Sequence, residues 1–325
     1  MNFAPLWIGA ALIGTALSVF LLYALLFFQG KNSLLWRSAP YQPRNPVPWT
    51  GVELLLFFAV GFFVMDASAL IISGISGHFR GLQFRLHLQE KSLEPAQEKQ
   101  LSKEHPITQL IVRGQDDPRV FLVVFLAGVV IAPIAEEFLF RLLLQGYVEK
   151  QEARLRKFLR LHGIRSALRG LFAVFCSSTI FAAIHWRSTA TDHTFRGLLD
   201  GFLVLTIGYS ALLAMITTYL LCVRGASPDD LGVNWRKIPG DCVLGIRAAF
   251  FLLPPVYLLN IGLAQLGLTF DPIPIFFFAV GTGLLYFRTH RILPCIVLHA
   301  VLNGVSVVFA YVNAYLFFLV LWGRT

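Results

Sequence analysis

The run PLWIGAALIGTALSVFLLYALLFF, residues 5–28, contains no charged side chain. About 20 consecutive apolar residues form a helix long enough to cross a bilayer, so this run can span one as a single helix. It has no basic segment ahead of it, and it exceeds the apolar part of a cleaved signal peptide in length. We therefore expect a membrane helix that the mature protein keeps.

The composition of the whole chain points the same way. Its 325 residues are 56% hydrophobic and 14% charged, and its mean hydropathy is +0.68. Soluble domains carry about 25% charged residues, so the composition indicates a membrane protein. The net charge of +9 lies in short loops beside apolar runs, as in cytoplasmic loops of membrane proteins, which argues against nucleic acid as a partner. The four cysteines stand singly, without zinc-site spacing, and we expect reduced thiols.

Apolar runs of spanning length recur along the chain. We predict an all-α, multi-pass transmembrane helical bundle of about eight spans. The expected spans are residues 5–28, 51–74, 119–147, 168–187, 198–223, 241–264, 272–287 and 292–322. The last run is either one tilted helix or a helix broken near Asn303 and Gly304, where glycine weakens the helix.

Basic residues in four of the loops agree on one orientation, with the N-terminus outside and these loops in the cytoplasm. The four loops hold residues 31–44, 150–169, 224–237 and 288–291. Segment 76–118 is the most polar part of the chain, and we predict a solvated excursion or an interfacial helix there. Asp66, in the second span, is expected to have a polar partner. His290 stands beside Arg288 and Arg291 and is interpreted as interfacial.

The stretch IAPIAEEFLFR, residues 131–141, places three charges in an apolar run. A charge at the bilayer centre costs about 2.5–3.5 kcal/mol on insertion scales, and such residues usually face a bundle interior or a cavity. On a helix, Glu137 and Arg141 are spaced for an ion pair, whereas Glu136 points about 100° away. We expect Glu136 to present a free carboxylate, next to a backbone that Pro133 loosens. The alternative is an interhelical salt bridge that only fixes packing.

Two further polar pairs lie on apolar helices. His185 follows Phe181 by about one turn in FAAIH, and Asn303 follows His299 by about one turn in HAVLN. Each pair alone is an ordinary contact between membrane helices. Together with the glutamates they supply a carboxylate, two imidazoles and an amide, which can deprotonate a water and donate hydrogen bonds to an oxyanion. This combination predicts hydrolysis of an amide bond inside a membrane.

The motifs EEFLFR, FAAIH and HAVLN, in this order, resemble those of the CPBP intramembrane peptidases. This family includes the type II CAAX prenyl endopeptidases and the bacteriocin-processing, Abi-like proteins, and residues 271–303 resemble its closing segment. The resemblance implies a glutamate-dependent endopeptidase. The implied catalytic residues are Glu136 and His185, which activate water, and His299 and Asn303, which stabilise the oxyanion. The implied supporting residues are Glu137, Arg141 and Phe181.

The family is often labelled as metalloproteases, so a divalent metal such as zinc is a possible cofactor. If a metal binds, the candidate ligands are Glu136, His185 and His299. The sequence contains no HExxH pair, the usual signature of a zinc-peptidase helix. The residues therefore favour a metal-free site without deciding the cofactor.

The resemblance covers residues 119–187 and 271–310, and the long interval between the second and third motifs indicates an insertion. The predicted divisions are 1–75 with two N-terminal helices, 76–118 as the polar segment, 119–187 as the first part of the catalytic core, 188–270 as an insertion with two extra spans, and 271–325 as the second part of the core. At 1.5 Å rise per residue, His185 would lie on the order of 15 Å from Glu136 in depth. Helix tilt, a kink at Pro133 or a short, re-entrant fourth segment would remove this separation.

Three functions compete. The first is an intramembrane endopeptidase acting on prenylated CAAX-like or leader-bearing peptides, whose partners are the lipid bilayer and a peptide or lipidated protein. The second is a non-enzymatic membrane scaffold or immunity protein with a polar packing network. The third is a proton or ion carrier that uses Glu136, Glu137, Asp66 and the histidines. The expected location is the plasma (cell inner) membrane, or the endoplasmic reticulum membrane in a eukaryote.

Overall fold

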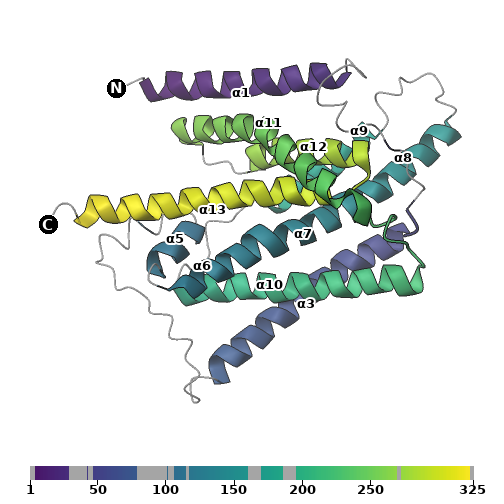
Figure 1. Cartoon of the computed structure of the whole chain (residues 1–325), viewed down its shortest axis with the longest axis horizontal. Coiled ribbons are helices and arrows are strands. Elements are labelled where there is room, and N and C mark those ends of the chain that lie inside the picture. The colour runs from purple at the N-terminus through teal and green to yellow at the C-terminus, as the bar shows by residue number, and fades with distance from the viewer. Residues whose placement is uncertain are drawn as a thin grey trace. The chain divides into compact units, whose positions relative to one another are not determined.

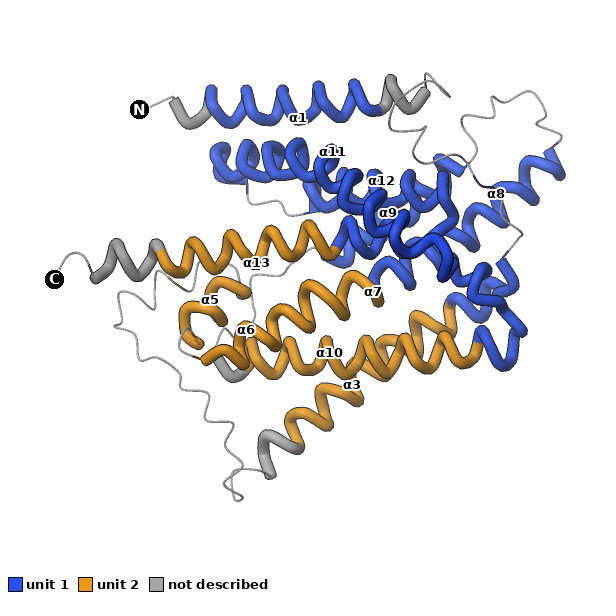
Figure 2. The backbone as a smooth tube through the Cα atoms, in the orientation of Figure 1, with its two compact units in different colours: residues 1–54, 136–188, 220–299 blue, residues 55–135, 189–219, 300–325 orange. Residues whose placement is uncertain are grey.

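The computed structural model describes residues 4–28, 42, 47–78, 101, 106–114, 117–159, 170–185, 195–268 and 272–322. These residues form helices and turns, and no strand occurs among them. The chain divides into two compact units (Figure 2). Unit 1 comprises residues 1–54, 136–188 and 220–299, and unit 2 comprises residues 55–135, 189–219 and 300–325.

Helices make up most of the described chain (Figure 1). In chain order they are α1 (Ala4–Phe28), α3 (Gly51–His78), α5 (Pro106–Arg113), α6 (Pro118–Val124), η1 (Phe125–Ile131), α7 (Ala132–Glu137), η2 (Phe138–Gln145), α8 (Gly146–Phe158), α9 (Leu171–Ile184), α10 (Phe195–Thr218), η4 (Tyr219–Val223), η5 (Trp235–Lys237), α11 (Ile238–Gln265), α12 (Pro272–Thr289) and α13 (Leu293–Trp322). Within the described parts of the chain, six helices are long and apolar enough to cross a membrane, and Trp7–Tyr23 and Leu171–Ile184 are shorter apolar helices. The predicted all-α, multi-pass bundle is confirmed.

One uninterrupted helix carries the glutamate motif. It consists of α6, η1, α7, η2 and α8 in succession. Asp117 caps its first turn by accepting from the backbone N–H of Arg119 at 2.9 Å, and Pro118 takes the first position, where no N–H is needed. A hydrogen bond from the Arg119 side chain lowers the pKa of the Asp117 carboxyl. The segments η1 and η2 are π-helical, so their backbone hydrogen bonds join residues five apart and widen the helix.

In unit 1, α1 packs along α11, and α9 packs against α12, η2 and α8. Ala16, Leu259 and Leu263 form a buried cluster between α1 and α11. The two backbones approach closely at Gly9 and Gly262, because a Cβ placed on Gly9 would lie 2.9 Å from the Gly262 carbonyl oxygen. Small residues of this kind let membrane helices pack backbone to backbone.

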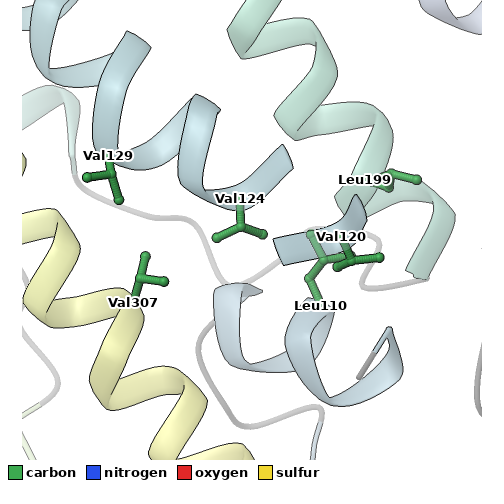
Figure 3. Close-up of a cluster of buried hydrophobic side chains, with 6 residues drawn as sticks. All are labelled: Leu110, Val120, Val124, Val129, Leu199 and Val307. Atoms are coloured by element: carbon green, nitrogen blue, oxygen red, sulfur yellow. The ribbon is translucent and has the colours of Figure 1, made fainter. Parts of the chain in front are cut away.

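In unit 2, α10 packs against α5, α6 and η1. Figure 3 shows a buried apolar cluster whose members are Leu110, Val120, Val124, Val129, Leu199 and Val307. The described part of the predicted polar segment includes the helix α5, which contributes Leu110 to a core, while residues 79–100, 102–105 and 115–116 of that segment lie outside the described residues. Asp66 is exposed on α3, and the described residues offer it no hydrogen bond or ion pair.

The last helix, α13, settles one alternative left by the sequence. It runs unbroken from Leu293 to Trp322, so the run is one helix. Its residues up to His299 belong to unit 1, and the remainder belongs to unit 2. Of the basic loops used to predict orientation, residues 29–41 and 160–169 lie outside the described residues, and the orientation stays a prediction.

Candidate active site

Glu136 lies between two histidine rings in unit 1. Its Oε2 is 3.6 Å from His185 Nε2 and 3.7 Å from His299 Nε2. Both separations exceed the usual hydrogen-bond range of about 2.7–3.2 Å. The Glu136 side chain also keeps 12% of its surface exposed. The Glu136 carboxylate thus faces two ring nitrogens at ion-pair distance, and its surroundings differ from those of the free carboxylate that the sequence analysis expects.

His185 follows the end of the short helix α9. This helix has 14 residues, or roughly 21 Å, which is less than the roughly 30 Å of a hydrocarbon core. His185 Nδ1 is 2.7 Å from the Phe181 carbonyl oxygen, which can only accept, so this nitrogen is the donor. In the neutral ring, Nε2 then carries the lone pair and faces Glu136. His185 and Glu136 therefore do not lie on the order of 15 Å apart in depth, because the helix that carries His185 is short.

Glu137 is held through both of its carboxylate oxygens. Its Oε1 accepts from His299 Nδ1 at 2.9 Å, and its Oε2 accepts from Arg141 Nε at 3.2 Å. The side chains of Glu137 and Arg141 are fully buried. The ion pair predicted from the helical spacing is confirmed. The two adjacent glutamates therefore have different surroundings, since Glu137 is fully buried with short hydrogen bonds on both oxygens, whereas Glu136 is partly exposed and has longer contacts to two histidines.

Phe181 packs against both histidines. Its ring centroid is 4.4 Å from that of His185 and 5.9 Å from that of His299. The Arg141 guanidinium lies 5.4 Å from the centroid of the same ring, within cation–π range. On α12, the Phe278 ring lies 5.1 Å from the His299 ring. These aromatic contacts restrict the planes of both imidazoles, which gives the supporting role predicted for Phe181 a physical basis.

Ser177 and Gln145 are site neighbours that the sequence analysis missed. Arg141 Nη1 donates to Ser177 Oγ at 3.1 Å, and Ser177 Oγ lies 3.4 Å from Gln145 Oε1. Gln145 Nε2 donates to the Gly283 carbonyl at 2.9 Å and to Glu149 Oε1 at 3.0 Å. Both Ser177 and Gln145 are fully buried. Together they extend the polar group around Arg141 towards α8.

His290 is buried against other parts of unit 1, while its interfacial position stays a prediction. It is only 9% exposed. Its Nε2 is 3.1 Å from Glu149 Oε2, and its Nδ1 is 2.6 Å from the Gln42 carbonyl oxygen. The polar network therefore runs from the glutamate motif to His290. A regular spacing of four residues is the signal that the sequence analysis overlooked, and it joins Glu137, Arg141, Gln145 and Glu149.

Asn303 belongs to unit 2, and its membership of the site stays a prediction. Its Nδ2 donates to the Gly128 carbonyl at 2.7 Å. Gly128 lies in η1, where the Ala132 N–H bonds to the Ala127 carbonyl, five residues back. The next bond of this kind would start at Pro133, which has no N–H. The Asn303 amide supplies the missing donor.

A family model described as type II CAAX prenyl endopeptidase, Rce1-like, matches residues 118–228 and 231–305, which is more than half of the chain. The chain belongs to the Rce1-like family. The predicted membership of the CPBP intramembrane peptidases is thereby confirmed. No curated protein and no solved structure matches the chain.

The Rce1-like match makes the chain a member of a protease family and a multi-pass membrane protein. The matched residues contain every residue predicted for the site. They also include most of residues 188–270, which the sequence analysis assigns to an insertion. The division into a two-part core and an insertion stays a prediction.

Metal binding by the candidate ligands stays a prediction. Among the described residues, no group of three or more His, Cys, Asp or Glu side chains is placed to hold a metal ion. The predicted ligands Glu136, His185 and His299 do face one another through Oε2 and the two Nε2 atoms, and the bond of His299 Nδ1 to Glu137 fixes the orientation of that ring. The mechanism proposed for this Rce1-like chain has no step through a metal.

Proposed function

We propose that this chain is a glutamate-dependent intramembrane endopeptidase that cleaves a prenylated, CAAX-like peptide or a small leader-bearing peptide. Family membership supports a peptidase, and the multi-pass bundle supports a substrate held at the membrane. One contrast carries the proposal: Glu137 is bonded through both oxygens, whereas Glu136 Oε2 faces two ring nitrogens at 3.6 and 3.7 Å. A partly exposed carboxylate whose contacts are this long is available to take a proton from a water.

Glu136 and His185 are proposed to activate the attacking water. Since His185 Nδ1 donates to the Phe181 carbonyl, its Nε2 is an acceptor in the neutral ring. A substrate water that lies beside Glu136 Oε2 and His185 Nε2 and contacts both meets an acceptor for each of its protons and keeps a lone pair for the scissile carbonyl. The new C–O bond forms as Glu136 takes a proton, which then passes to the leaving amine when the C–N bond breaks.

His299 is proposed to donate to the oxyanion. Its Nδ1–H bonds to Glu137, so the ring becomes a donor at Nε2 when that nitrogen also carries a proton. The Glu137 carboxylate, itself held by Arg141, complements the resulting positive charge. Asn303 uses one amide N–H on the Gly128 carbonyl and has a second N–H, and its donation to an oxyanion stays the prediction made from the sequence.

The test is Glu136→Gln in the full chain reconstituted into liposomes. The amide keeps the shape of the side chain and cannot act as a base, so the cleavage rate should fall by at least about 100-fold. The matched control is Asp66→Asn, which makes the same chemical change on an exposed position of α3. We expect that control to cleave at the wild-type rate, and both variants should unfold at the wild-type temperature.

Three peptides distinguish the substrate classes: a farnesylated peptide with a CAAX ending, the same peptide without the lipid, and a leader-bearing peptide. Cleavage of the first alone supports prenyl-protein processing, and cleavage of the third supports leader processing. If wild type cleaves none of them, or if Glu136→Gln remains fully active, the proposed mechanism is wrong. Proton uptake by the liposomes that disappears in Asp66→Asn would instead support the carrier.

A further inference from the structure

Gln145 is a fully buried amide in the middle of an apolar helix. A polar side chain in such a place needs partners, and this one has a partner on every polar atom. Its Nε2 donates to the Gly283 carbonyl at 2.9 Å and to Glu149 Oε1 at 3.0 Å. Its Oε1 lies 3.4 Å from Ser177 Oγ, whose one proton is shared between Gln145 and the Val174 carbonyl at 3.1 Å. Two acceptors on one side and a hydroxyl on the other leave one orientation for the amide.

On one side, Gln145 meets the residues that hold the site. Ser177 Oγ accepts from Arg141 Nη1 at 3.1 Å, and Arg141 Nε donates to Glu137 at 3.2 Å. Space is tight here: a Cβ placed on Gly283 would lie 3.1 Å from Gln145 Oε1 and 3.4 Å from Arg141 Nη1. A displaced amide at Gln145 would therefore disturb Ser177, which accepts from Arg141.

On the other side, Gln145 is anchored by Glu149 and His290. Glu149 uses Oε1 for Gln145 and Oε2 for His290 Nε2, at 3.0 and 3.1 Å. His290 in turn holds the Gln42 carbonyl through Nδ1 at 2.6 Å. The backbone of His290 has φ +46°, in the left-handed region that residues with a Cβ rarely adopt. Such a conformation persists only when the surroundings fix it, which marks this end of the network as rigid.

We propose that Gln145 is a positioning residue of the peptidase: it holds Arg141 in place, so that Glu137 stays aligned with Nδ1 of His299. This inference rests on the proposed function for the role of His299. Gln145 touches none of the reacting atoms and acts through Ser177 and Arg141. Its effect should therefore appear in the rate of the chemical step and not in substrate affinity.

The first test is Gln145→Glu, which preserves the shape of the side chain and replaces both N–H donors by an acceptor. The new carboxylate faces the Gly283 carbonyl and the Glu149 carboxylate, so the side chain must turn away and release Arg141. We expect kcat to fall by about 10- to 100-fold, as small misplacements do at catalytic sites, with KM within about twofold of wild type. The matched control is Gln151→Glu on the same helix, at a partly exposed position. Wild-type kcat in Gln145→Glu would overturn the proposal.

The second test is a rescue that exchanges donor and acceptor. Adding Glu149→Gln to Gln145→Glu restores one donor–acceptor pair between the two positions and keeps the number of carboxylates unchanged. We expect the double variant to recover part of the lost kcat. An equal kcat in the single and double variants would show that the pair of side chains has no positioning role.

A third measurement does not depend on activity. In protein with ¹⁵N-labelled histidine, the Nδ1 resonance of His299, assigned with His299→Asn, reports the bond to Glu137. It should shift in Gln145→Glu and stay unchanged in Gln151→Glu. An unchanged resonance in Gln145→Glu refutes the positioning role even if the wild type cleaves peptide. Conversely, a shifted resonance in a chain that cleaves nothing refutes the proposed function alone.

Discussion

The two π-helical segments of the long helix, η1 and η2, differ in the polar groups that they present to other parts of the chain. In unit 2, η1 leaves the Gly128 carbonyl without a backbone donor, and a single side chain, Asn303, bonds to it. In unit 1, η2 presents Arg141 and Gln145, both fully buried, to a series of polar partners. One widened turn thus frees a backbone acceptor, and the other arranges long polar side chains.

The geometry of a widened turn explains the second arrangement. In an α-helix, four residues rotate about 40° beyond a full turn, so a row with four-residue spacing drifts around the helix. A π-helical turn takes more residues, which removes this drift. Glu137, Arg141 and Gln145 can therefore stay on one face, and each reaches the next group in the network. π-Helical turns are frequent at functional sites. Here the π-helical turn keeps side chains spaced four residues apart on the same face of the helix.

The largest effect should come from Arg141→Met, which breaks the network at its most buried charge. Glu137 would keep its bond to His299 but lose the guanidinium, and the removal of one partner from a buried ion pair costs about 3–5 kcal/mol. We expect the free energy of unfolding in detergent to fall by that amount and cleavage to be lost. Circular dichroism against denaturant measures the first, and a peptide assay measures the second.

The control for this prediction is the double variant Glu137→Gln with Arg141→Met. It removes both charges, so no unpaired carboxylate is left buried, and most of the stability should return. Cleavage should stay low because His299 no longer has a carboxylate behind Nδ1. A double variant as unstable as the single one would show that Arg141 matters for packing and not for charge.

A smaller effect should distinguish the glycines that pack at the two turns. A Cβ on Gly283 would lie 3.0 Å from Val174 Cγ1 and 3.1 Å from Gln145 Oε1, whereas a Cβ on Gly128 would meet nothing within 4 Å. Because Gln145 is fixed by its hydrogen bonds, Gly283→Ala should lower the free energy of unfolding by about 1–3 kcal/mol. Gly128→Ala should be neutral or stabilising by up to about 1 kcal/mol, since alanine favours a helix. Equal effects at both positions would contradict the tight packing at η2.

Much of the fold was predictable because membrane helices have a length and a composition of their own. The run at residues 5–28 and the other apolar runs coincide with helices for this reason. The pair of Glu137 and Arg141 was predictable because helical periodicity alone brings them together. The grouping of Glu136, His185 and His299 came from motif resemblance, since nothing in local periodicity places three helices side by side.

Other features depend on contacts that a pattern does not contain. Gln145 looks like one polar residue in an apolar run, and its partners Ser177 and Gly283 lie on other helices. The contact of His290 with Glu149 was not predictable, because its sequence neighbours are charged and a turn after α12 brings it against Glu149. The π-helical turns also escaped prediction, because the expected period is that of an α-helix. Pro133 was the one sequence feature that indicated an altered backbone, next to η1.

The smallest effect should come from η1 and tests why Asn303 bonds to Gly128. Asn303→Leu leaves that carbonyl without its donor, which should cost about 1 kcal/mol of unfolding free energy, a typical net value for one hydrogen bond. Pro133→Ala introduces a backbone N–H that can reach the same carbonyl in the π-helical register. In the Pro133→Ala background, Asn303→Leu should therefore lower the free energy of unfolding by less. The cycle of wild type, two single variants and the double variant should give a coupling energy of about 0.5 kcal/mol or more. Strictly additive effects would mean that the new N–H bonds elsewhere, so that the proline is not what makes Gly128 available to Asn303.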